Sequence, residues 1–488
     1  MADQTRGLRR TSTVLSPDQS RVLLRAFNPG DSDRTGRIIS RVMALPEAEV
    51  SRLLEEVEQE FRQRHAHLRM RFLRRFEEVC GDDVRATEVS AERQFLIGAY
   101  FLAEYSLESA ALFNPSIVPH PSQDGVPPGS LRFILSLRAT GEGHVSSITF
   151  RTGVVDSENR ITLEQPSGLL TEPEQIPNAR YETGLFARKL SELGFKSAFV
   201  DRVIARLGDS FSMQGLQEAV DAEIDERSSE GVPDEDRGAA RGVLMLARSN
   251  YEVRFQPDQH LSARILFPAT PSQRNGIEDA RFVRFRKADG THVYYATFTA
   301  FDGRVIVPEL VQTADFVTFR FTTLNGPAAQ NKGMALFPRM IGGRYAMLSR
   351  QDNESIHIMF SDNVHFWNER KVLLRPRFTW ELVQLGNCGS PIETEAGWLV
   401  LSHGVGPVRR YCIGAFLLDR EDPSKVIGRL RDPLLEPNQR EREGYVPNVV
   451  YTCGALLHGS ELIIPYGLAD HATGFATVPL NEVLEAMV

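Results

Sequence analysis

The octapeptide Asn275–Phe282 reads Asn-Gly-Ile-Glu-Asp-Ala-Arg-Phe and places two adjacent carboxylates and an arginine after a turn signal. Asn-Gly favours positive φ, so a tight turn is expected ahead of a β-rich run. Side chains of neighbouring residues in an extended chain point to opposite faces, so Glu278 and Asp279 are expected to face apart, with one of them holding the backbone. Asp279 and Arg281 would share a face, which pairs a proton-handling carboxylate with a fixed cation. The alternative is a surface turn with a local ion pair.

Other polar residues stand near the ends of apolar segments far away in the chain. Arginines and a lysine that converge near an acid suit a phosphate or another oxyanion, because guanidinium donors match oxyanion geometry. Rings such as Tyr345, Trp398 and Tyr466 would suit a sugar. Each arginine alone is more typical of a surface or an ion pair, so the interpretation depends on these groups meeting in space. The groups are Arg138; Asn331, Lys332, Arg339 and Arg350; Asn387 to Pro391 with His403 and Gly404; and Pro447 and Asn448 with Tyr466 to Asp470.

A weak internal repeat could bring these groups together. In each copy a turn, often with glycine, leads into an apolar strand that ends in a polar or ring-bearing residue, and the last four copies recur every roughly 50 to 60 residues, a spacing typical of propeller blades. The simplest architecture is a mainly β, five-bladed propeller with a helical insertion after the first blade; the alternative is a β-sandwich. The copies are 129–135, 290–296, 342–348, 397–403 and 459–466.

Helical periodicity surrounds these strands. Residues 1 to about 40 are predicted to be a polar arm with a short strand-like piece at 21–24, and the apolar spacing predicts helices from Leu45 to Phe61, from His65 to Val79 and from Ser90 to Leu112. Residues 131–138 and 146–155 are predicted strands, and helices return from about 180 to 248. The expected organisation is therefore an N-terminal arm and helical region over 1–112 and a propeller over 113–488 that carries the insertion.

Composition limits the classes of function. The net charge of −8 argues against general nucleic-acid binding. The four cysteines are widely spaced, without the pairs typical of a zinc site or a disulfide framework, which favours a reducing compartment. No apolar run approaches the roughly 18 residues of a membrane span, and the N-terminus lacks the apolar region of a secretion signal. A cytoplasmic protein without membrane or nucleic-acid partners is expected.

The sequence resembles glycoside hydrolase family 130, the inverting β-mannoside phosphorylases and β-mannosidases, from roughly Asn114 to the C-terminus apart from the helical insertion. Residues 276–281 match the signature Gly-x-Glu-Asp-Pro-Arg except for Ala280 in place of proline. Members of the family are five-bladed β-propellers. Further matches, in order, are Asn114-Pro115, Lys332 with 336–338, 347–350, 361–362 with 366–367, 391–392 with Thr394 and 397–399, 403–405, 448–450, and 466–467 with 469–470.

The resemblance implies a mechanism. Asp279 would be the general acid, with its proton passing through a hydroxyl of the mannosyl ring, and inorganic phosphate would attack the anomeric carbon from the opposite face to give α-mannose 1-phosphate. Lys332, Arg350 and His403 would bind phosphate with help from Arg281, and Asp470 would hold sugar hydroxyls. Arg138, Glu278, Asn448 and Tyr466 are the other expected substrate-binding residues. Neither a metal nor an organic cofactor is required, and the partners are a β-mannoside oligosaccharide and phosphate.

Two departures leave alternatives open. Gln384 stands where phosphorylases of the family carry a lysine, and family members that hydrolyse use carboxylates to activate water, a role that Glu393 or Glu381 could fill. An inverting β-mannosidase is therefore the second hypothesis, and a non-catalytic carbohydrate-binding propeller is the third. The second departure is the presence of additional helices. They could shape the sugar-accepting side, build a homo-oligomer, or simply support the sheets.

Overall fold

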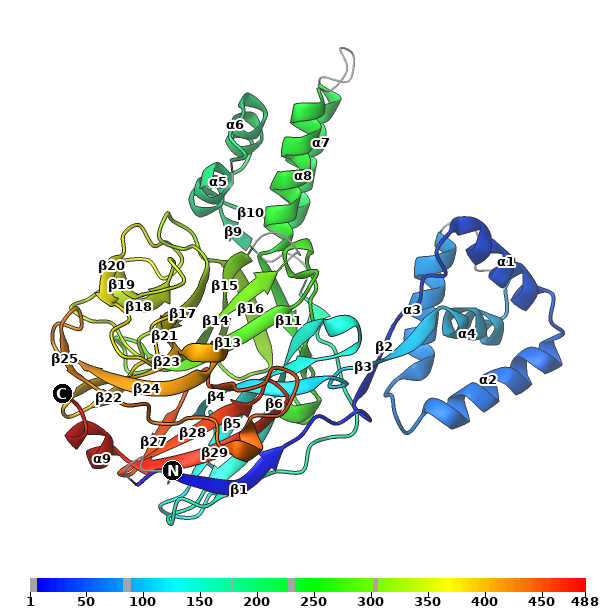
Figure 1. Ribbon diagram of the computed structural model, residues 1–488. Coiled ribbons are helices and arrows are strands. Elements are labelled where there is room, and N and C mark those ends of the chain that lie inside the picture. Colours follow the sequence, from blue (N-terminus) through cyan, green and yellow to red (C-terminus); the bar gives the residue numbers. More distant parts are fainter. Residues whose placement is uncertain (1–6, 82–88, 177–179, 193, 227–232, 302–305) are drawn as a thin grey trace.

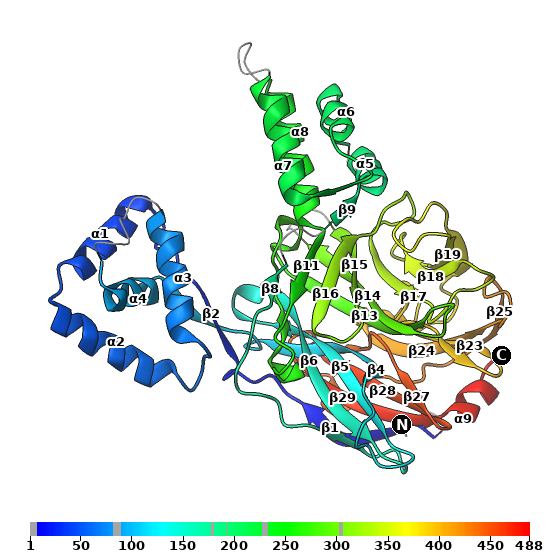
Figure 2. The same ribbon diagram turned by 180° about the vertical axis from the view of Figure 1, so that it is seen from behind.

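The computed structural model describes residues 7–81, 89–176, 180–192, 194–226, 233–301 and 306–488. Residues 1–6 of the predicted arm and 177–179 beside the predicted insertion lie outside the described residues. The described part of the chain is mainly β, with five antiparallel sheets of four to six strands and two groups of helices (Figures 1 and 2). No described helix is both long and apolar enough to cross a bilayer.

Each sheet is built mainly from consecutive strands. The first contains β4 (Ala111–Pro119), β5 (Leu131–Thr140), β6 (Ser146–Val155), β7 (Ile161–Leu163) and β12 (Ile265–Leu266). The second contains β13 (Ile277–Arg286), β14 (His292–Phe301), β15 (Ile306–Thr313), β16 (Thr318–Thr323), β11 (Tyr251–Arg254) and β8 (Glu174–Gln175). The third contains β17 (Lys332–Leu336), β18 (Tyr345–Arg350), β19 (Ile356–Ser361) and β20 (Lys371–Leu374).

The fourth and fifth sheets complete the β region. The fourth contains β21 (Gln384–Asn387), β22 (Ile392–Thr394), β23 (Gly397–Val405), β24 (Tyr411–Leu418) and β25 (Val426–Arg429). The fifth contains β26 (Val450–Tyr451), β27 (Leu456–His458), β28 (Glu461–Leu468), β29 (Ala472–Pro479) and the N-terminal strand β1 (Arg9–Leu15), and α9 (Leu480–Glu485) follows it. The five repeat copies therefore supply β5, β14, β18, β23 and β28, one strand to each sheet.

The apolar core lies between the sheets. One cluster joins the first and second sheets through Phe150 and Phe319, and others join the second to the third and the third to the fourth. The fourth and fifth sheets share a core that contains Leu401 and Ile464. A further cluster joins the fifth sheet back to the first, where the rings of Phe475 and Phe133 lie 6.4 Å apart. Each of the five sheets thus shares buried apolar surface with two others, and this burial is the main contribution to their association.

The N-terminal region differs from the sequence prediction in three places. The predicted polar arm contains β1, which pairs with β29, and a helix, α1 (Ser32–Met43), begins within it. The helix predicted over 90–112 ends early, because α4 covers Ala91–Tyr100 and the chain then forms β3 (Leu102–Ser106), which pairs with β2 (Val22–Ala26), before it enters β4. Helices α1 (Ser32–Met43), α2 (Glu47–Phe61), α3 (Leu68–Cys80) and α4 form a group beside the sheets, joined to them through β2 and β3 (Figure 1).

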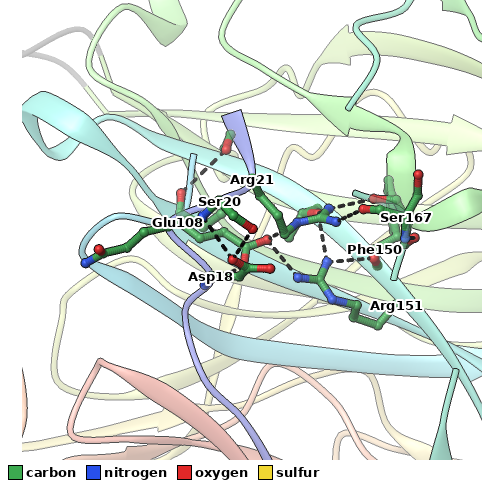
Figure 3. Close-up of polar contacts among 12 residues, drawn as sticks. Asp18, Ser20, Arg21, Glu108, Phe150, Arg151 and Ser167 are labelled. Atoms are coloured by element: carbon green, nitrogen blue, oxygen red, sulfur yellow. Dashed lines mark hydrogen bonds and ion pairs between the residues drawn. The ribbon is translucent and has the colours of Figure 1, made fainter. Parts of the chain in front are cut away.

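A buried ion-pair network fixes the start of this N-terminal region to the first sheet (Figure 3). The carboxylate of Glu108 accepts hydrogen bonds from Arg21 at 2.8 Å and from Arg151 of β6 at 2.7 Å. Arg21 also donates to the carbonyls of Ser167 and Ser262, each at 2.6 Å. All three charged residues are at most 2% exposed, so loss of Glu108 would leave two buried guanidinium groups without their shared carboxylate.

The second group of helices lies between β9 (Arg180–Glu182) and β11. It consists of α5 (Thr183–Glu192), α6 (Ala198–Ala205), α7 (Met213–Asp225) and α8 (Asp234–Arg248), with β10 (Ser210–Ser212) paired to β9. These helices share an apolar core of their own and rise away from the edge of the second sheet (Figures 1 and 2).

Candidate active site

The predicted turn leads into β13, whose second and third residues are two carboxylates that meet one arginine. Gly276 has φ 126°, and its N–H donates to the carbonyl of Gln273 at 2.7 Å. Arg138, near the end of β5, donates to Glu278 at 2.8 Å and to Asp279 at 3.4 Å. The expectation that Glu278 and Asp279 face apart is therefore wrong. The register of β13 shifts between Glu278 and Arg281, and Asp279 adopts φ 54°, so the strand bulges and the alternation of side chains is interrupted.

A second bulge, in β4 of the first sheet, lies against the bulge of β13. The register of β4 shifts between Phe113 and Ser116, and Asn114 has φ 49°. The amide of Asn114 donates to Asp279 at 2.7 Å, and the Ser116 hydroxyl accepts a hydrogen bond from the N–H of Phe282 at 3.0 Å. The two strained segments thus hold each other, and together they fix the direction of the Asp279 carboxylate.

Charges around Asp279 determine its protonation. Burial favours the neutral acid, but Arg138, Arg281, the Asn114 hydrogen bond and Lys332 outweigh burial and lower the pKa of Asp279. Asp470 behaves in the opposite way. Its burial and the nearby negative charge of Asp279 raise the pKa of Asp470 to about 6, against the opposing effect of Arg138. The site therefore contains two carboxyl groups whose proton affinities are pushed apart.

Arg281 is held by the protein on three sides. Its guanidinium donates to the carbonyl of Cys388 at 2.7 Å, to the carbonyl of Asp279 at 3.1 Å and to the hydroxyl of Tyr451 at 2.7 Å. The side chain is buried, at 3% exposure. These contacts tie the bulge of β13 to the fourth and fifth sheets, so Arg281 supports the backbone that carries Asp279.

Lys332, Arg350 and His403 come together on the side formed by the third and fourth sheets. Lys332 lies opposite Arg350 in the register of β17 and β18. Arg350 donates to Nε2 of His403 at 3.1 Å. Because an arginine can only donate, Nε2 must accept, and the proton of the neutral imidazole is on Nδ1. Burial and the neighbouring cations Arg350, Arg281 and Lys332 lower the pKa of His403 well below its usual range, which agrees with a neutral ring.

Several buried polar atoms on this side have no hydrogen-bond partner in the described protein. They include two donors, Arg350 Nε and His403 Nδ1, together with the side-chain oxygens of Asn387 and Ser390. The ring of His403 is fixed by stacking on Tyr411, with the centroids 5.8 Å apart. Buried polar atoms are normally paired, so unpaired donors beside a buried cation indicate a place for an anionic ligand.

The backbone at Gly386 leaves room for this pair of side chains. A Cβ at this position would lie 2.3 Å from Nε2 of His403 and 3.0 Å from Cδ of Arg350. Gln384, the predicted site of the missing lysine, is half-buried two positions earlier on β21. Gly386 was not singled out from the sequence, because its role depends on a strand pairing that only the fold reveals.

The remaining predicted residues fall into two groups. Asp470 lies within electrostatic reach of Asp279 and Arg138. The backbone carbonyl of Asn448 accepts a hydrogen bond from the N–H of Tyr411, which places Asn448 beside the ring that stacks on His403. Tyr466, by contrast, is 2% exposed in the core between the fourth and fifth sheets, and its hydroxyl donates to Glu441 at 2.7 Å. The expectation that Tyr466 binds sugar is therefore wrong, because its ring is turned into the core.

The carboxylates proposed for a hydrolytic reaction are engaged elsewhere. Glu393 pairs with Arg339 at 2.7 Å, and Glu381, at 0% exposure, accepts hydrogen bonds from the N–H groups of Arg377 and Phe378 and pairs with Arg429. Within the described part of the chain, no group of three or more His, Cys, Asp or Glu side chains is placed to hold a metal ion.

The arrangement is suited to acid-assisted displacement by an anion. Carboxylates lie with Arg138 on the side of β4, β5 and β13, and a cluster of buried nitrogen donors lies on the side of β17, β18 and β23. Besides Gly386, three contributors were missed as site residues in the sequence. Asn114 had a signal in its Asn-Pro pair, whereas Tyr411 and Tyr451 had none.

Comparison with known proteins places this site in context. The sequence model of the family described as β-1,4-mannooligosaccharide phosphorylase, glycoside hydrolase family 130, matches residues 242–488. A 1,2-β-oligomannan phosphorylase of Thermoanaerobacter sp. is 36% identical over 231 residues, which are 46% of this chain and 75% of that protein. A β-1,2-mannobiose phosphorylase of Listeria innocua is 33% identical over 252 residues, which are 50% of this chain and 68% of that protein.

The chain is also similar to a solved structure, the β-1,2-mannobiose phosphorylase from Listeria innocua in complex with β-1,2-mannobiose. The match covers 77% of this chain and 92% of the Listeria chain, with a TM-score of 0.47 and 23% identity.

Proposed function

Because the chain belongs to glycoside hydrolase family 130, we propose that it is an inverting phosphorylase that cleaves β-mannosides with inorganic phosphate. The products are α-mannose 1-phosphate and a shortened saccharide. The observation that carries the proposal is the two-sided site, with the Asp279 carboxylate on one side and the Arg350–His403 pair, with its unpartnered donors, on the other. An inverting enzyme needs room for the nucleophile opposite the acid, and cations suit phosphate in that position.

In this proposal Asp279 is the general acid, and Lys332, Arg350 and His403 bind phosphate. The neutral His403 donates from Nδ1, and Arg350 donates from Nε; both are buried donors on this side of the site that the described protein leaves unpaired. Arg281 positions the acid instead of contacting phosphate, because three protein groups already hold it. Arg138, Glu278, Asn448 and Asp470 bind the sugar, with Arg138 also orienting both neighbouring carboxylates.

Phosphate would also help to keep the proton on the acid. The cations that lower the pKa of Asp279 include Lys332. Negative charge placed beside Lys332 offsets part of that positive potential, so the pKa of Asp279 rises when phosphate binds. Phosphate binding thus favours the protonated form of Asp279 that the reaction needs, relative to the free enzyme.

We also propose that the five sheets are the blades of a propeller formed by residues 113–488 with β1, and that α5–α8 are an insertion in it. This is supported by the order of the shared cores, which runs from the first sheet to the fifth and returns to the first. It is also supported by the packing of β4 against both β13 and β28. In a propeller, the innermost strand of each blade begins near the central axis, and the strand next to it ends there. Asp279 lies near the start of β13, and Arg350 lies at the end of β18.

The test is product analysis with β-1,2- and β-1,4-mannobiose. A phosphorylase releases mannose 1-phosphate only when phosphate is present. Equal release of free mannose without phosphate would instead establish the β-mannosidase, for which Glu393 and Glu381 are poorly placed because arginines already bind them. Binding without turnover, unchanged in Asp279→Asn, would establish a carbohydrate-binding protein.

A further inference from the structure

Helices α5 and α8 hold the segment that leads into the proposed phosphate site. The ammonium of Lys189 in α5 donates to the carbonyl of Leu324 at 2.8 Å. The carboxylate of Glu192, at the end of α5, accepts a hydrogen bond from the N–H of Gly326 at 2.7 Å. Asn250, which follows α8, accepts one from the N–H of Thr323 at 3.1 Å. Three side chains from the helical group thus fix the backbone just after β16.

The chain between these contacts and Lys332 is tightly held. Gly326 has φ 100°, and a Cβ there would lie 2.1 Å from the carbonyl oxygen of Trp367. The N–H of Ala328 donates to that same carbonyl at 3.1 Å. Asn331 donates to the carbonyl of Gln351, the residue after Arg350, at 3.0 Å. A shift of the backbone at Gly326 is therefore passed on to Lys332 and to the strand end that carries Arg350.

The same helices reach the turn that carries the acid. The hydroxyl of Ser249, which follows α8, lies 3.0 Å from the hydroxyl of Ser272. Ser272 and Gln273 both donate to the buried carboxylate of Glu309, at 3.0 Å and 2.8 Å. The carbonyl of Gln273 in turn accepts the N–H of Gly276 at the start of the acid turn. Each side of the site is thus connected to the helical group through one short chain of hydrogen bonds.

We propose that α5 and α8 position the phosphate site, and that Glu192 is the positioning residue for Lys332. The inference rests on the proposed function for the identity of the anion. Glu192 contacts Lys189 and the N–H of Gly326, and it acts on the site through Gly326. If these helices only supported the sheets, loss of the Glu192 contact would lower the stability of the whole chain. In the proposed role, its loss lowers the affinity for phosphate more than the affinity for the sugar.

The experiment measures phosphate binding by calorimetry and the KM values for phosphate and mannobiose in the full-length protein. Glu192→Ala removes the acceptor for the Gly326 N–H, and we expect the Kd and KM for inorganic phosphate to rise about tenfold, the effect of one lost hydrogen bond to a charged group. The KM for mannobiose should change less than twofold. Glu192→Gln keeps an acceptor oxygen, so it should restore phosphate affinity to within about threefold of the wild type. Glu218→Ala on α7, whose carboxylate accepts a hydrogen bond from Gln214 of its own helix, is the matched control.

Two results would overturn the inference. One is a phosphate Kd in Glu192→Ala within twofold of the wild type. The other is a loss that affects phosphate and mannobiose equally and that Glu192→Gln does not restore. Failure of the proposed function gives a different result, because the wild-type protein would then cleave mannobiose at the same rate with and without phosphate. If Glu192→Ala does not fold, the phosphate Kd of Asn250→Ala decides, with the same tenfold expectation.

Discussion

The two sides of the site differ in how completely the protein satisfies their polar groups. On the acid side, Asp279 accepts hydrogen bonds from Asn114 and Arg138, and Arg281 has three protein partners. Among the described residues of this side, the buried atom without a partner is an acceptor, the side-chain oxygen of Asn114. On the cation side, Arg350 and His403 contact each other and keep buried donors without partners in the described protein. The difference indicates that the acid is oriented before any ligand binds, whereas the cation side is completed by the ligand. Changes on the acid side should therefore lower kcat, and changes on the cation side should raise the KM for phosphate.

The largest effect is expected for Asp279→Asn. The amide is nearly isosteric but cannot donate the catalytic proton, so kcat should fall by about 10²–10⁴-fold. The KM for phosphate should fall or stay constant, because a negative charge near the cations is removed. The assay is release of mannose 1-phosphate under saturating mannobiose. A variant with more than a tenth of wild-type kcat would exclude Asp279 as the acid.

The cation side is tested by Arg350→Ala and Arg350→Lys. Loss of a charged, buried donor should raise the KM for phosphate by about 10²-fold, and lysine should recover only part of the loss because it cannot reproduce the guanidinium geometry. Arg344→Ala, on the exposed turn before the same strand, is the control. If Arg350→Ala reduced kcat and left the KM for phosphate unchanged, the cation side would behave as expected for the acid side, and the distinction between the two sides would be wrong.

A smaller effect is expected from one added methyl group. In Gly386→Ala the new Cβ would displace the side chains of His403 and Arg350, which lie 2.3 Å and 3.0 Å from its position. The KM for phosphate should rise about tenfold with little change in kcat. Gly168→Ala, where no atom lies within 4 Å of the added Cβ, is the matched control. A loss of kcat alone would show that Gly386 serves the acid side.

The smallest effect concerns the pH dependence of stability. The pKa of Asp470 is raised to about 6 in the folded protein, above its ordinary value near 3.8. Stability from this group is therefore fully present below about pH 4 and is lost as the pH rises through about 6. Asp470→Asn removes the titration, so the difference in Tm between variant and wild type should grow from near zero at pH 4 to a few degrees at pH 8.

Thermal unfolding followed across that pH range checks the prediction, with Asp432→Asn at an exposed carboxyl as the control. A Tm difference that stays constant between pH 4 and pH 8 would show that Asp470 does not hold a proton in the folded site.

Much of this arrangement is visible in the sequence, for identifiable reasons. The apolar strands of the repeat are local patterns, so β5, β14, β18, β23 and β28 could all be predicted from periodicity. Both carboxylates face Arg138 because β13 bulges against β14, and Asn114 reaches Asp279 from a bulge of β4 in another sheet, so neither feature follows from local sequence. The apolar run after Tyr100 suits a helix or a strand equally well, and only its pairing with β2 makes it a strand. The aromatic ring of Tyr466 is of a type that suits a sugar, but the direction in which the ring points depends on core packing.

The most direct test of the two-sided site is the position of an oxyanion in crystals soaked with phosphate and mannose. The account predicts phosphate within hydrogen-bond distance of Arg350 Nε and His403 Nδ1, close to Lys332, with the sugar between it and the carboxyl of Asp279. Phosphate bound instead to Arg138 on the acid side, or its absence from the Arg350–His403 pair at saturating concentration, would contradict it.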